Sequence, residues 1–160
     1  MTTTHNRFLI AGAAMSGVAA LAHLGCIAFG ASWYRFFGAG EQMAQMASAG
    51  HWYPGTMAAA IASVLAIWSL YALSGAGVIR RLPFVRVVLG AITGVYLMRG
   101  IAFLPMLAYF PGRSMGFWLW SSGICLAIGL VHLAGLRQAW ARLGMRSDNV
   151  FEAGPFRGSA

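Results

Sequence analysis

Lysine is absent from this sequence, and acidic residues are scarce. All eleven basic residues are arginines, while Glu41, Asp148 and Glu152 are the only acids, which gives a formal net charge of +8. Charged residues make up 9% of the chain and hydrophobic residues 59%, proportions that exclude an ordinary soluble globular domain. The arginines lie mainly between apolar runs, where membrane topology and anionic lipid head groups account for them. We therefore expect a membrane protein whose partners include membrane lipid and not nucleic acid.

Recognisable catalytic and cofactor motifs are also missing. The chain has no GxSxG, HExxH, Walker or GxGxxG sequence. Its two cysteines, Cys26 and Cys125, lie inside apolar runs without CxxC or CxxH spacing, which favours small buried side chains over a redox or metal role. The motifs therefore assign no enzyme class, and they leave the identity of any cofactor open.

Four apolar runs are present, each about 20 residues long and thus able to cross the hydrocarbon core of a bilayer as a helix. They cover residues 8–30, 55–77, 87–107 and 116–136. Strands of a membrane barrel would alternate apolar and polar residues, whereas these runs are apolar on all sides. The sequence therefore predicts an all-α integral membrane protein, a bundle of four transmembrane helices within a single domain of residues 1–146. The polar, glycine-rich residues 147–160 are expected to form a flexible cytoplasmic tail.

The one long loop, residues 31–54, carries the signals of a membrane surface. Aromatic residues cluster at both of its ends, as is typical of the belts that Trp and Tyr form at the interface. Between them, residues 39–49 contain no strand former and place Met43 and Met46 on one side. We expect a short interfacial helix here, with both methionines facing the bilayer and Glu41 in the first turn, where the helix dipole favours a carboxylate.

The distribution of arginine predicts the orientation in the membrane. One side of the predicted bundle receives only Arg35 and Arg113, and the other receives a larger group: Arg7, Arg80, Arg81, Arg86, Arg137, Arg142 and Arg146. Because basic loops are retained in the cytoplasm, both termini should be cytoplasmic and the 31–54 loop external. The predicted location is the inner membrane of the cell, crossed several times.

Arg99 is the residue that most clearly marks a candidate site. It lies near the middle of the 87–107 run, where an unpaired guanidinium would cost from about 3 to more than 10 kcal/mol, so it requires an acid, carbonyls, water or a bound anion. At about 1.5 Å per residue along a helix, other polar side chains fall in the same outer half of the bundle. The predicted ligand-binding set is Arg99, Glu41, His23, Ser121, Ser122 and His51. A purely structural ion pair between Arg99 and Glu41 is the rival interpretation.

These residues support several functional hypotheses. The first is binding or transport of a lipid-like or small amphipathic anionic molecule in an outer-half pocket around Arg99. The second is a structural or accessory subunit, because Gly90 and Gly94 form a GxxxG spacing that permits close contact with a partner membrane protein or a second copy. The third is an enzyme that uses His23 and Glu41 on a lipid substrate.

Metal and haem binding are the remaining alternatives. Met43, Met46, Met57, His23 and His51 approach the outer face, and thioethers with imidazole suit Cu(I). Methionines on the apolar face of an interfacial helix explain the same residues, so no metal ligand is assigned. His23 and His132 fall at opposite depths of antiparallel helices, which argues against a single haem held by both.

Overall fold

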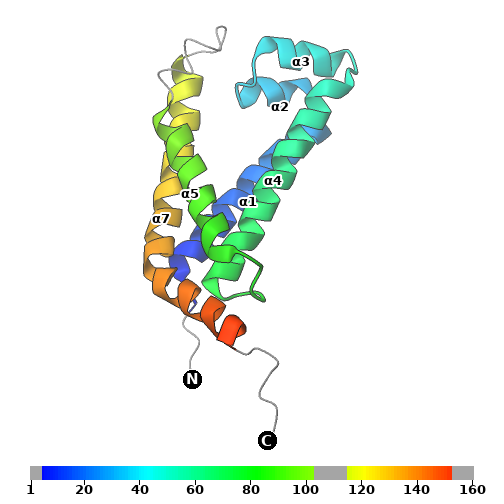
Figure 1. Cartoon of the computed structure of the whole chain (residues 1–160). Helices are drawn as coiled ribbons and strands as arrows, with labels where there is room; N and C mark the ends of the chain where they lie inside the picture. The colour runs from blue at the N-terminus through cyan, green and yellow to red at the C-terminus, as the bar shows by residue number, and fades with distance from the viewer. Residues whose placement is uncertain (1–4, 103–114, 153–160) are drawn as a thin grey trace, which may run out of the picture.

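The computed structural model describes residues 5–102 and 115–152, with the backbone alone described for 145–152. The described part of the chain is almost entirely helical and contains no strand. Two long pairs of helices form most of the molecule, α1 with α4 and α5 with α7, and two short helices, α2 and α3, lie at one end (Figure 1). We call this the α2–α3 end, and the opposite end, where the first and last described residues lie, the terminal end.

The first pair consists of α1 (Arg7–Phe29) and α4 (Trp52–Ala76). Helix α1 begins at Asn6, whose side-chain oxygen accepts a hydrogen bond from the Leu9 amide at 3.0 Å. It ends at Gly30, which adopts a positive φ of 68°. The two helices pack along their length, and the Ser69 hydroxyl donates to the Ala13 carbonyl oxygen at 2.8 Å.

The second pair consists of α5 (Val85–Ile101) and α7 (Met115–Glu152). Helix α7 is 38 residues long and continues well beyond the predicted end of the last apolar run at residue 136. Residues 147–152 are therefore helical, although the sequence placed them in a flexible tail. Residues 153–160 of that tail lie outside the described part of the chain.

The two pairs meet at the terminal end. Leu9 of α1 is fully buried, and a Cβ atom added at Gly135 of α7 would lie only 2.7 Å from its Cγ. A Cβ atom added at Gly75 of α4 would lie 2.4 Å from Cδ1 of Leu89 in α5, which is also fully buried. Leucines thus fit against glycines where all four long helices converge, while toward the α2–α3 end the pairs diverge (Figure 1).

A second, smaller core lies under helices α2 (Ala31–Phe36) and α3 (Glu41–Ser48). Cys26, Tyr34, Ala44 and Ala58 are buried in it, and Met43 packs against them. The helix predicted within residues 39–49 is therefore present. That Met43 and Met46 face the bilayer stays a prediction; Met43 is half-buried and packs against this core.

Within the described residues, three helices are long and apolar enough to cross a membrane, which indicates a membrane protein: Arg7–Phe29, Trp52–Ala76 and the Met115–Gly144 part of α7. The predicted fourth span, residues 87–107, corresponds to α5. This helix has 17 residues and ends at Ile101, and residues 103–107 of the run lie outside the described part of the chain. The four-span count therefore stays a prediction.

Candidate functional site

Close contact between α5 and α7 creates the surroundings of Arg99. A Cβ atom added at Gly100 would lie 2.9 Å from the backbone nitrogen of Leu126. A Cβ atom at Gly129 would lie 3.0 Å from the backbone nitrogen of Leu97. Since only glycine permits such backbone contact, the two helices approach closely on either side of this crossing. Side chains near it can therefore bond across the helix pair.

The Arg99 guanidinium bonds to two neighbouring hydroxyls on α7. Its Nη1 donates to Ser122 Oγ at 3.0 Å and its Nη2 donates to Ser121 Oγ at 3.1 Å. The central carbon of the guanidinium lies 5.3 Å from the centre of the Trp118 ring, a distance at which the ring's quadrupole attracts a cation. Ser122 is buried, whereas Arg99 and Ser121 are half-buried. Arg99 thus lies at the surface of the helix pair, and its described contacts all come from α7.

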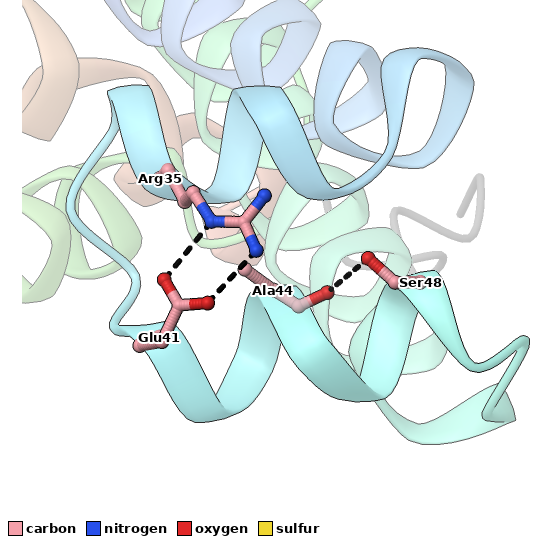
Figure 2. A network of polar contacts seen from close by, with 4 residues as sticks. All are labelled: Arg35, Glu41, Ala44 and Ser48. Carbon is pink, nitrogen blue, oxygen red and sulfur yellow. Dashed lines mark hydrogen bonds and ion pairs between the residues drawn. The ribbon is translucent and has the colours of Figure 1, made fainter.

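No carboxylate neutralises Arg99 among the described side chains. Glu41, the predicted partner, instead forms a two-point ion pair with Arg35, with Nε–Oε2 and Nη2–Oε1 distances of 2.9 and 2.8 Å (Figure 2). The hydrogen bond and charge of Arg35 lower the pKa of the Glu41 carboxyl below its ordinary value. The predicted Arg99–Glu41 clamp is therefore wrong, because the tight turn between α2 and α3 brings the nearer arginine to Glu41.

The other two predicted site residues bond within their own elements. His23 is half-buried, and its Nδ1 lies 2.8 Å from the Ala19 carbonyl oxygen one turn earlier in α1. His51 is exposed and caps α4, since its Nδ1 accepts from the Tyr53 amide at 3.2 Å. Of the six predicted residues, hydrogen bonds in the described part of the chain connect only Arg99, Ser121 and Ser122 into one cluster.

A second polar cluster, which the sequence did not predict, lies inside the main core. Tyr96 and Ser16 share a hydrogen bond of 2.9 Å between their hydroxyls, and the Tyr96 ring packs edge-on against Trp68 at 5.0 Å between centroids. The fully buried His132 also packs against Tyr96, with 5.4 Å between ring centroids. Its Nδ1 donates to the Ile128 carbonyl oxygen at 3.0 Å, and its Nε2 has no hydrogen-bond partner among the described residues.

The length of α7 explains why this cluster escaped prediction. The sequence placed the end of the last helix at residue 136, which put His132 near a membrane surface where a histidine reaches water easily. The helix continues to Glu152, so His132 lies well inside it and packs against Gly12 of α1. One signal was available in the sequence, because Gly12 and Ser16 are one turn apart on the same face of α1.

No known protein family, curated protein or solved structure was found to match this chain. Functional conclusions therefore depend on the geometry of its own side chains.

Proposed function

We propose that this protein binds the anionic head group of a lipid-like or small amphipathic molecule at Arg99. The observation that carries the proposal is a guanidinium in an apolar helix pair whose partners are two neutral hydroxyls. Arginine keeps its charge in proteins, and its five N–H donors suit a carboxylate or a phosphate. Two serine oxygens leave most of that donor capacity to a bound anion or to water.

Exposed apolar side chains around Arg99 support an amphipathic ligand over a simple anion. Met98 and Ile101 flank Arg99 on α5, and Leu119 and Trp120 precede the two serines on α7; all four are more than half exposed. A cation bordered by apolar surface matches a molecule with a charged head and an apolar tail.

The test compares a fluorescent long-chain fatty acid with its uncharged methyl ester, both added to the purified protein in detergent. We expect the protein to prefer the anion by about tenfold or more, since a hydrogen bond to a charged group contributes about 1.5–3 kcal/mol. Arg99→Met should remove the preference and leave ester binding unchanged. Ser121→Ala combined with Ser122→Ala retains the charge and should weaken anion binding less.

Arg35→Met is the matched control, because it removes one arginine charge from the α2–α3 end without touching the Arg99 cluster. This variant should keep the preference for the anion. Equal binding of acid and ester by the unmodified protein, or an anion preference that survives Arg99→Met, would contradict the proposed function.

A structural or accessory role is the second candidate, favoured by a different observation. Cβ atoms added at Gly90 and Gly94 would meet nothing within 4 Å, so the GxxxG face of α5 is not used inside the described chain. Such a face permits close approach of a helix from a partner or a second copy. Native mass spectrometry of the detergent-extracted protein separates the two candidates, because it reports co-purified lipid and subunit number together.

The enzyme and copper hypotheses receive less support. His23 bonds to its own helix and Glu41 to Arg35, so no described hydrogen bond joins the pair assigned to lipid chemistry. Met43 packs against the small apolar core under α2 and α3, which a structural role explains without a metal.

A further inference from the structure

Two arginines at the terminal end are fixed against one stretch of helix α7. The guanidinium carbon of Arg86 lies 3.9 Å above the centre of the Trp140 ring. The Nη1 atom of Arg86 also lies against Gly144, since a Cβ atom there would be only 2.6 Å away. Arg81 donates a hydrogen bond from Nη2 to the Leu143 carbonyl oxygen. Both cations are thus held on the same short stretch of α7, at residues 140–144.

The loop that carries Arg81 is itself ordered by hydrogen bonds to α4. The buried Ser74 hydroxyl accepts from the Leu82 amide at 2.8 Å and donates to the Arg80 carbonyl oxygen at 3.2 Å. Gly77 ends α4 with φ at 81°, in the left-handed conformation that glycine adopts without strain. Because the loop is anchored on both sides of Arg81, little backbone entropy is lost when a ligand binds there.

Exposed apolar side chains lie in the same segment as these cations. Phe84, with a positive φ of 51°, is 79% exposed between Arg81 and Arg86, and Val87 is 70% exposed. A nucleic acid or an acidic peptide would leave these side chains in water, whereas the interfacial region of a bilayer accommodates them. Glu41, the one acid whose side chain is described, lies at the α2–α3 end and cannot neutralise this surface.

We propose that Arg81 and Arg86 form a binding site for the phosphate of an anionic phospholipid, whose acyl chains lie along Phe84 and Val87. Guanidinium groups donate paired hydrogen bonds to phosphate oxygens, and stacking on Trp140 orients one of the two groups before the lipid arrives. The site shares no residue with the Arg99 cluster, so either proposal can fail without the other.

The test uses native mass spectrometry of the delipidated protein in detergent. It compares the affinity of the protein for phosphatidylglycerol with its affinity for phosphatidylcholine of identical acyl chains. We expect phosphatidylglycerol to bind more tightly than phosphatidylcholine. Arg81→Gln with Arg86→Gln should weaken phosphatidylglycerol binding about 25-fold, from roughly fivefold per arginine. Trp140→Leu retains all charges but removes the ring that orients Arg86. It should weaken phosphatidylglycerol binding by a smaller factor than the double arginine variant does. Circular dichroism of each variant reports whether the helices remain folded.

The matched control is Arg7→Gln with Arg137→Gln, which removes the same charge from two exposed arginines of α1 and α7. This pair should lower phosphatidylglycerol affinity by less than about threefold in 0.15 M salt, because salt partly screens exposed charges that do not bond to the lipid phosphate. Equal losses in the two double variants would overturn the proposal in favour of a diffuse basic surface. Equal binding of the two lipids would overturn it as well, as would displacement of phosphatidylglycerol by millimolar inorganic phosphate, which would indicate a soluble anion.

Discussion

Gly12 shows how a single missing methyl group can determine the position of a whole side chain. A Cβ atom at this position would lie 2.6 Å from Cε1 and 2.7 Å from Nδ1 of His132. The histidine ring cannot retreat easily, because it is fully buried, bonded to the Ile128 carbonyl and packed against Tyr96. The absence of a side chain at Gly12 is therefore what allows α1 and α7 to meet.

We predict that Gly12→Ala lowers the free energy of unfolding in detergent by about 1–3 kcal/mol, the usual cost of overpacking a core. The measurement is denaturant unfolding followed by tryptophan fluorescence. Gly94→Ala is the control, since its added methyl group meets nothing within 4 Å. It should leave stability unchanged or raise it by up to about 1 kcal/mol, because alanine favours a helix. A Gly12→Ala protein as stable as the Gly94→Ala protein would rule out tight packing at His132.

At the scale of residues, depth along the helices was predictable but the choice of partner was not. The rise per residue placed Arg99, Ser121 and Ser122 at similar levels, and these three side chains do bond together. Depth also allowed Glu41 as a partner for Arg99. In the structure Glu41 pairs with Arg35 instead. This pairing depends on the turn between α2 and α3, and hydrophobic periodicity does not predict the geometry of that turn.

At the scale of elements, the α2–α3 hairpin is held by its ion pair as well as by its small apolar core. Within α3 itself, the Ser48 hydroxyl donates a hydrogen bond to the Ala44 carbonyl oxygen at 3.1 Å (Figure 2). Burial in the same core raises the pKa of the Tyr34 hydroxyl. The charged link lies outside the core, on the exposed surface, and is therefore the part of the hairpin that responds to pH.

Acidification should loosen this hairpin. The pKa of Glu41 is lowered in the folded protein, so the ion pair contributes fully above the ordinary carboxyl pKa and is lost as the pH falls through the lowered value. We predict that a nitroxide attached through Gln42→Cys becomes more mobile on acidification from pH 7 to about pH 3. Adding Glu41→Gln should give the mobile spectrum at both pH values. A transition that persists in this variant would have to come from another group.

Helix boundaries were predictable where an apolar run ends at a glycine. They were not predictable where a helix continues beyond its apolar run. Apolar length located α1 and α4 closely, and Gly30 and Gly77 mark their ends. The end of α7 was placed too early, because its polar continuation lacks the apolar run used to detect spans. Contacts of α7 with Arg81 and Arg86 stabilise part of that continuation, and such contacts between distant segments leave no periodic signal in the sequence.

At the scale of the whole molecule, the charge asymmetry between the two ends predicts the orientation. Most arginines with described side chains lie at the terminal end, and Arg35 lies at the α2–α3 end (Figure 1). We predict that a reporter enzyme active only outside the cytoplasm stays inactive when fused to either terminus. The same reporter inserted between Phe37 and Gly40 should be active. Activity from a terminal fusion would reverse the assignment.

Packing of the first turns of α1 against the later part of α7 has a consequence for how the protein is made. Asn6 donates to the Gly135 carbonyl at 3.0 Å, and Leu9 fills the space above Gly135. The ribosome synthesises Asn6 and Leu9 early and Gly135 late. The first helix therefore enters the membrane before the part of α7 that packs against it has been made. Until then, Leu9 must contact lipid instead, and the Asn6 amide must bond to water or lipid head groups. Assembly therefore cannot finish while the chain is still being translated through α5, and a protein truncated before residue 135 would leave its first helix without this partner.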